Sequence, residues 1–152
     1  MADDPHDLDR FVRAQSPCYG RALTEIRAGR KRSHWMWFIF PPLAGLGRSP
    51  ASRTYAIRSP AEAEAFLRHP VLGPRLTECA GAALAVGDRP VHALFDSPDD
   101  RKLRSCATLF ALVSPPGSVF HRLLETFFRG EPDPETLRLL GCGGTSGDST
   151  CR

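Results

Sequence analysis

The sequence repeatedly places a small polar residue directly before a proline. The pairs are Ser16-Pro17, Ser49-Pro50, Ser59-Pro60, Ser97-Pro98 and Asp133-Pro134. The side-chain oxygen of Ser or Asp can accept a hydrogen bond from a backbone N–H of the first helical turn, and proline already has the φ angle that this turn requires. The pattern therefore predicts five helix starts in a chain built from several helices.

Apolar residues between these pairs recur at helical spacing. Leu8, Phe11 and Val12 form the first group, and a second group ends near Gly29, which is a typical stop signal for a helix. Further helices are predicted at 60–68, 70–86, 98–113, 118–129 and 134–140, with a short buried helix inside 33–40. No segment alternates polar and apolar residues as a half-buried strand does. We therefore predict an all-α fold of about six to eight short helices.

The length suits one compact domain. With 152 residues, of which 41% are hydrophobic, the chain can bury a sizeable core, and we expect a single domain over 7–140. Residues 141–152 have no apolar anchor and are predicted to be a disordered tail. No apolar stretch reaches the ~20 residues of a membrane span, and the acidic N-terminus is unlike a secretory signal. We expect a cytoplasmic protein without membrane contact, and its oligomeric state stays open.

Charge and cysteine content argue against nucleic acid as a partner and against a metal site. The net charge of +3 is too small to require nucleic acid, which therefore ranks as an unfavoured partner. The five cysteines show no CxxC spacing, so no metal site is expected, and Cys79 and Cys106 lie in apolar stretches typical of buried thiols. Of the 20 basic residues 18 are Arg, and the only lysines, Lys31 and Lys102, lie in the two densest polar segments.

The first of these segments spans residues 27–41. Four cations precede an indole-rich stretch that contains His34, Trp35 and Trp37. Guanidinium and ammonium groups bind phosphate, and tryptophan stacks on flat rings, so the combination suits a nucleotide. The alternative interpretation is that Trp35, Met36, Phe38 and Ile39 belong to the core and that the basic run is a solvated helix end.

The second segment spans residues 95–110. Ser97 is predicted to cap a helix whose first turn contains Asp99 and Asp100, where negative charge is favourable. The same helix would place Lys102 and Ser105 on one face, three residues apart. The alternative interpretation needs no ligand and assigns the charges to capping and to an ion pair between Asp100 and Arg104.

Several long motifs in these segments resemble a known family. They are KRSHWMWFIFPPLAGLGRS, YAI, HPVLGPRLTEC and SPDDRKLRSCATLFALV. Over about residues 7–140 the sequence is similar to the bacterial family known as domain of unknown function 1810, sometimes labelled calpastatin-like. The resemblance implies a small, mainly α-helical cytoplasmic domain and brings no established activity. The sequence departs from the family pattern at Pro42, where Gln is expected, and at Cys106-Ala107, where Ser-Met is common.

These observations lead to two hypotheses about function. In the first, the two segments form a cleft that binds, and in an enzymatic version hydrolyses, an anionic nucleotide-like or ADP-ribose-like metabolite. In the second, the chain is a non-catalytic module that contacts a protein partner through its aromatic residues. GxSxG, Walker, GxGxxG and HExxH motifs are absent, so no cofactor is expected and enzymatic activity stays open. The candidate ligand-binding residues are Lys31, Arg32, Trp35, Trp37, Asp99, Lys102 and Ser105, and the candidate catalytic residues are His34 and Asp100.

Overall fold

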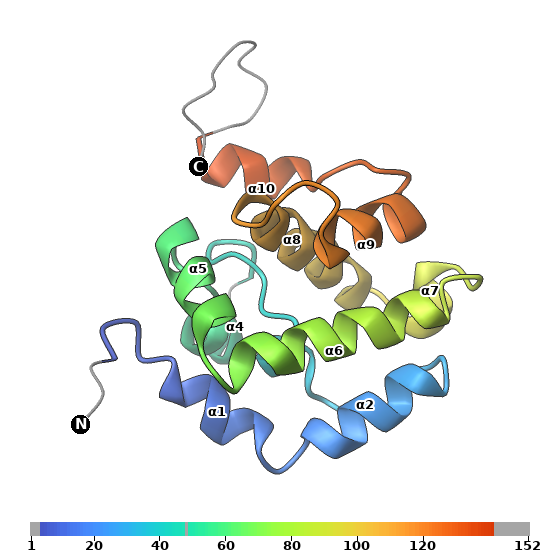
Figure 1. The fold of residues 1–152 in the computed structure, drawn as a ribbon, viewed down its shortest axis with the longest axis horizontal. Coiled ribbons are helices and arrows are strands. Elements are labelled where there is room, and N and C mark those ends of the chain that lie inside the picture. The colour runs from blue at the N-terminus through green and yellow to red at the C-terminus, as the bar shows by residue number, and fades with distance from the viewer. Residues whose placement is uncertain (1–3, 48, 142–152) are drawn as a thin grey trace.

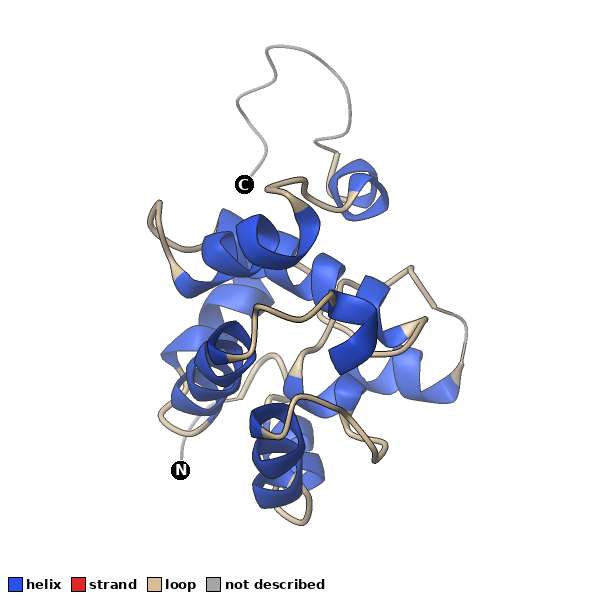
Figure 2. Cartoon of the chain, turned by 90° about the vertical axis from the view of Figure 1, so that its right-hand side faces the viewer, coloured by secondary structure: helices blue, strands red, loops and turns tan. Residues whose placement is uncertain are grey.

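A computed structural model describes residues 4–47 and 49–141 of the chain. This part contains ten α-helices and, apart from an isolated bridge between Leu43 and Ile57, no β-structure (Figure 2). The all-α prediction is confirmed. The helices are α1 (Asp9–Gln15), α2 (Tyr19–Arg27), α3 (Met36–Ile39), α4 (Pro50–Tyr55), α5 (Pro60–Arg68), α6 (Leu72–Ala85), α7 (Val91–Leu94), α8 (Asp99–Leu112), α9 (Val119–Phe128) and α10 (Pro134–Leu139).

Three of the five predicted helix starts are confirmed. The side chains of Ser49, Ser59 and Asp133 each accept a hydrogen bond from the backbone N–H three residues later, at the starts of α4, α5 and α10. In each case proline occupies the first helical turn, where its missing N–H costs nothing. The local rule therefore places these three helices correctly.

At the other two pairs the predicted cap is not formed, although α8 does begin at Asp99, one residue after its predicted start. Ser16 ends α1 rather than starting a helix, because its hydroxyl donates to the carbonyl oxygen of Val12 one turn earlier. Pro98 takes the cap position of α8, no side chain caps this end, and the Ser97-Pro98 peptide is cis. Ser49 and Ser59, which cap their helices, have an extended backbone, as is typical of cap residues, whereas the backbone of Ser16 is helical.

The helices surround a core that is rich in phenylalanine. In Figure 1, α6 crosses the middle of the molecule, α1 and α2 lie below it, and α8, α9 and α10 lie above. Phe66 links the helices below α6 to those above it, because its ring contacts Phe11 of α1 at 5.1 Å and Phe110 of α8 at 5.4 Å between centroids. Phe110 in turn contacts Phe120 of α9 at 5.4 Å. The short α3 packs against α1, α4, α6 and α8, so the aromatic segment 33–40 is held from several sides.

The structure tests the predictions that two thiols are buried and that no helix spans a membrane. Cys79 and Cys106 are buried and free, as predicted, and burial raises the pKa of the Cys79 thiol to about 12. Cys142 and Cys151 lie outside the described residues, and so does the predicted disordered tail from residue 142 onward. None of the helices described is both long and apolar enough to cross a bilayer.

Candidate functional site

The loop that leads into α3 is held by a buried carboxylate. After α2, Gly29 adopts a left-handed conformation with φ of 82°, and the chain turns back toward the molecule. Glu25 of α2 then accepts hydrogen bonds from the backbone N–H groups of Arg32 and Ser33, from the Ser33 hydroxyl and from the indole N–H of Trp35, at 2.6–2.9 Å. One side chain therefore fixes the whole segment that carries the first set of candidate residues.

These hydrogen bonds also determine the ionisation of Glu25. Burial alone would raise its pKa, but the four hydrogen bonds to the carboxylate outweigh burial and lower the pKa to about 2. Glu25 is thus a carboxylate in the folded protein near neutral pH. Its charge stabilises the loop rather than taking part in proton transfer.

The two lysines of the chain meet at one carboxylate. Asp99, in the first turn of α8, accepts from Lys31 Nζ at 2.9 Å through Oδ2 and from Lys102 Nζ at 3.0 Å through Oδ1. The three side chains are only 18%, 11% and 21% exposed, respectively. Burial would raise the pKa of Asp99, but its bonds to Lys31 and Lys102 outweigh burial and leave the pKa below its ordinary value. Asp99 therefore joins the two predicted segments as an ionised bridge.

Each lysine also lies against a tryptophan. Lys102 Nζ is 4.5 Å from the ring centroid of Trp37, and Lys31 Nζ is 5.2 Å from that of Trp35. Both distances are within the range of a cation–π contact. The ammonium groups are therefore positioned by a carboxylate on one side and by an aromatic ring on the other.

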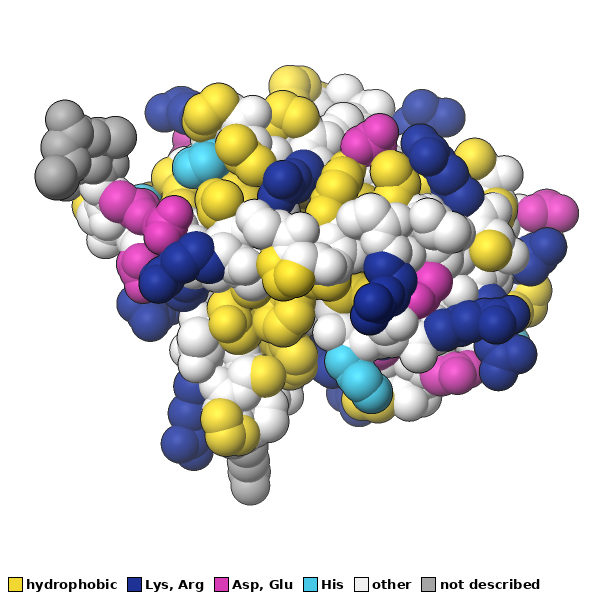
Figure 3. Space-filling model, turned by 90° about the horizontal axis from the view of Figure 1, so that it is seen from below, with side chains coloured by type: hydrophobic (Ala, Val, Ile, Leu, Met, Phe, Trp, Pro, Cys, Tyr) yellow, Lys and Arg dark blue, Asp and Glu magenta, His cyan; other side chains and the backbone are white. Residues whose placement is uncertain are grey.

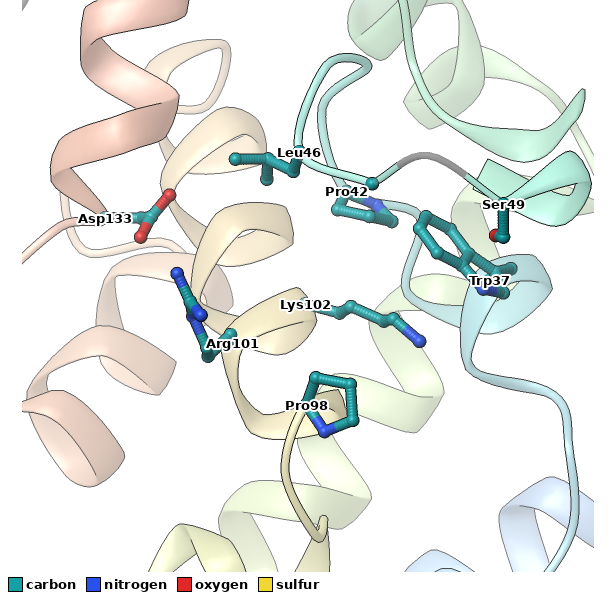
Figure 4. Close-up of a pocket in the computed structure, with 9 residues that line it drawn as sticks. Trp37, Pro42, Leu46, Ser49, Pro98, Arg101, Lys102 and Asp133 are labelled. Carbon is teal, nitrogen blue, oxygen red and sulfur yellow. The ribbon is translucent and has the colours of Figure 1, made fainter. Parts of the chain in front are cut away.

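Two cavities flank the Lys102–Trp37 contact. The larger has a volume of about 300 Å³ and is lined by Trp37, Pro42, Leu46, Gly47, Ser49, Pro98, Arg101, Lys102 and Asp133. In Figure 4, the Lys102 side chain extends from α8 toward Trp37, whereas Arg101 extends toward Asp133. The smaller cavity has a volume of about 210 Å³ and is lined by Lys31, His34, Trp35, Met36, Trp37, Phe38, Ala51, Asp99 and Lys102. We call these the ring-side cavity and the lysine-side cavity.

Six of the nine candidate residues predicted from the sequence come together around the lysine-side cavity. They are Lys31, His34, Trp35, Trp37, Asp99 and Lys102. His34 is exposed at this cavity, and Trp37 is half-buried between the two cavities. Trp35 differs from Trp37, because it is almost fully buried, donates its indole N–H to Glu25 and packs edge-on against Phe95. Trp35 is therefore a core residue whose edge reaches the cavity.

The other three candidates lie elsewhere. The side chain of Arg32 is exposed and lines neither cavity. Asp100 also lines neither cavity, and its carboxylate accepts from the backbone N–H of Arg101, the next residue of α8. Ser105 is fully buried, where its hydroxyl oxygen accepts from Leu43 N at 3.3 Å and from Thr136 Oγ1 at 2.7 Å. In this structure Ser105 joins α10 and the loop before α4 to α8, and it does not face the ligand space.

The alternative interpretations of the two segments are partly correct. Trp35, Met36 and Ile39 belong to the core, as the alternative for the first segment expected, but Phe38, which it also assigned to the core, is only half-buried. The ion pair expected between Asp100 and Arg104 is not formed. Arg104 instead donates to the carbonyl oxygen of Glu131 and lies 3.7 Å from its carboxylate, because the loop after α9 passes over this part of α8.

Sequence reasoning missed most of the walls of the ring-side cavity. Arg101 and Pro98 stand next to the predicted residues in the chain, so their proximity was available as a signal. The sequence carries no such signal for Leu46 or Asp133. Leu46 looks like an ordinary loop residue, and Asp133 looks like a helix cap, which it is at the start of α10. Across residues 4–47 and 49–141, no group of three or more His, Cys, Asp or Glu side chains could hold a metal ion.

Comparisons with known proteins place this chain in a family. The profile of a family described as "Protein of unknown function (DUF1810)" matches residues 5–140. The fold is similar to the crystal structure of the conserved hypothetical protein Rv1873 from Mycobacterium tuberculosis, with 49% sequence identity, a TM-score of 0.88, and coverage of 91% of this chain and 99% of that chain. No curated protein matches the sequence. Since the profile covers nearly all of the described residues, the chain belongs to the DUF1810 family of proteins of unknown function.

Proposed function

We propose that this protein binds a small, anionic, ring-bearing metabolite, such as a nucleotide or an ADP-ribose-like compound, at the two cavities beside Trp37 and Lys102. The observation that carries the proposal is the convergence of both lysines and an exposed histidine on a cavity walled by tryptophan. Ammonium groups bind phosphate or carboxylate, and an indole binds a flat ring. At about 300 Å³, the ring-side cavity is at the lower end of the range for small-molecule sites, which favours a compact ligand.

The geometry supports binding more strongly than hydrolysis. A general base must reach the reacting proton, and Asp100, the carboxylate predicted for this role, lines neither cavity. Asp99 does line the lysine-side cavity, but both of its oxygens are engaged by lysines and its pKa is lowered. A carboxylate in this state is a weak base and no acid near neutral pH. The proposal is therefore a ligand-binding function, with His34 as a contact to the anionic group.

The surface gives less support to macromolecular partners. On the face seen in Figure 3, basic side chains occur in separate groups with acidic and hydrophobic side chains between them, rather than as one continuous stripe. Nucleic-acid binding proteins usually concentrate their basic residues on one face. Among the residues described, the large hydrophobic side chains that are exposed are Leu112 and Leu139, on different helices. Neither feature favours a nucleic-acid or protein-interaction function over the cavities.

Thermal unfolding with and without candidate ligands tests the proposal. Adenosine monophosphate, ADP-ribose, NAD and sugar phosphates would each be added at millimolar concentration. A ligand present at a hundred times its Kd stabilises the folded state by about 2.7 kcal/mol, which for a domain of this size raises Tm by roughly 5 to 10 °C. We expect at least one of these compounds to produce such a shift.

The same measurement on Lys102→Met locates the effect. Methionine keeps most of the apolar length of the side chain but removes the ammonium group that lies over Trp37, so we expect the shift to fall close to zero. Arg13→Met is the control, because Arg13 is exposed on α1 and lies outside both cavities. A panel without any stabilising compound, or a shift that persists in Lys102→Met, would contradict the proposal.

A further inference from the structure

We infer that the two cavities are complementary subsites for the two ends of one ligand, with a single anionic group in the lysine-side cavity and a flat ring in the ring-side cavity. This inference rests on the proposed function and adds the class of ligand. Trp37 and Lys102 line both cavities, so the two spaces share a wall. A ligand that occupies both would pass along this wall.

Donor capacity assigns the anion to the lysine-side cavity. Each ammonium group has three N–H donors, and Asp99 takes one from Lys31 and one from Lys102. Among the described residues, no other side-chain or backbone acceptor is bonded to either ammonium group. Both groups are largely shielded from water, so their remaining donors gain most from an acceptor that enters the cavity. His34 supplies a further ring nitrogen at the same cavity.

The charge balance limits how many anionic groups fit there. Two ammonium groups face one ionised carboxylate, so Lys31, Lys102 and Asp99 together carry one excess positive charge. One carboxylate would balance this excess, and one phosphate group, with a charge of about −1.5 to −2 near pH 7, already exceeds it. A second anionic group would meet the repulsion of Asp99 without a new cation in the cavity. The site therefore favours a monophosphate or monocarboxylate over a polyphosphate.

The walls of the ring-side cavity suit a flat, weakly polar group. Trp37, Pro42, Leu46 and Pro98 supply apolar surface, and Arg101, Ser49 and Asp133 supply hydrogen-bonding groups. In Figure 4, Arg101 is directed toward Asp133, away from the ammonium of Lys102, so the cations of this cavity do not converge on one point. A heterocycle fits this pattern, because it offers two apolar faces and a polar edge.

The ratio of two affinities tests the division. Isothermal titration calorimetry would give the Kd of adenosine and of adenosine monophosphate, which differ only in the phosphate. Charge-assisted hydrogen bonds contribute about 1.5–3 kcal/mol, so we expect the wild-type protein to bind the monophosphate about 10 to 100 times more tightly than adenosine. Adenosine triphosphate should bind no more tightly than the monophosphate.

Two variants that each fill one cavity are then compared. Ala51→Leu adds bulk to the lysine-side cavity and should reduce the affinity ratio to near one while the affinity for adenosine is retained. Leu46→Trp adds bulk to the ring-side cavity and should weaken both ligands while the ratio is retained. His34→Ala, which changes an exposed side chain and so spares the fold, should lower the ratio about 2- to 10-fold, as the loss of one hydrogen bond predicts.

The outcomes separate this inference from the proposed function. If the wild-type protein binds these compounds with a ratio near one, or if both filled variants change the ratio equally, the division into subsites is wrong and ligand binding stands. If adenosine, its phosphates and the sugar phosphates all fail to bind, the proposed function and the inference fail together.

Discussion

Replacing Arg10 by methionine is expected to lower the free energy of unfolding by about 3–5 kcal/mol, because it leaves a buried carboxylate without its partner. The guanidinium of Arg10 lies 2.6 Å from Glu62 Oε2, and the two side chains are only 7% and 2% exposed. The remaining guanidinium donors bind four backbone carbonyl groups, those of His6, Asp7, Thr54 and Ala56. The side chain thus joins α1 to the end of α4 and to α5.

Chemical denaturation with a matched control measures this effect. Arg13 is on the same helix and pairs with Asp9 at 3.0 Å, but its side chain and that of Asp9 are 72% and 60% exposed. Arg13→Met should change the stability by at most about 1 kcal/mol, as exposed ion pairs usually do. Similar small changes in Arg10→Met and Arg13→Met would show that the buried pair does not hold these helices together.

Replacing Glu25 by glutamine is expected to cost about 3 kcal/mol near neutral pH. The lowering of its pKa from 4.5 to about 2 measures how strongly the folded protein prefers the charged form, and each unit corresponds to 1.36 kcal/mol. Glutamine has one acceptor oxygen in place of a carboxylate, and its NH₂ group would face donors from Ser33 or Trp35. Glu125→Gln, on the exposed face of α9, serves as the control and should stay within about 0.5 kcal/mol of wild type.

The effect of Glu25→Gln should depend on pH. Because the folded-state pKa lies below the unfolded one, the stabilisation is fully present above about pH 4.5 and is lost as the pH falls toward about 2. The difference in unfolding free energy between wild type and Glu25→Gln should therefore shrink over this range. A difference that is constant with pH would mean that the loss arises from packing instead of from the charge.

Much of the fold follows from local sequence chemistry. The bounds of α5 agree with the prediction at both ends, because Ser59 caps the helix and the chain becomes extended at His69. The short α7 was missed, since four residues carry no repeat from which a helical period can be recognised. The capping role predicted for Ser97 is not observed, because α8 begins at Asp99 and Pro98 takes the cap position.

The sequence predicted that the two segments meet, but not the contacts that join them. The sequence singled out both lysines, but their shared partner Asp99 follows only when α8 is packed beside the loop before α3. Ser105 is predicted to bind the ligand because helical spacing puts it on the same face of α8 as Lys102. Helical spacing does not show which element covers that face, and in the structure Thr136 of α10 covers Ser105. Trp35 fits the alternative interpretation of its segment, because it is a core residue that reaches the lysine-side cavity only with its edge, whereas Trp37 lines both cavities.

The most direct test of ligand binding at this site is a tryptophan fluorescence titration with adenosine monophosphate. Trp35 and Trp37 are the two tryptophans of the chain, and Trp37→Phe leaves Trp35 as the sole indole, in the core. We predict a saturable change in wild-type emission that is much smaller in Trp37→Phe, where only the edge of Trp35 reaches the lysine-side cavity, and that is lost in Lys102→Met. An equal saturable change in Trp37→Phe, or no change in the wild-type protein, would contradict binding beside Trp37.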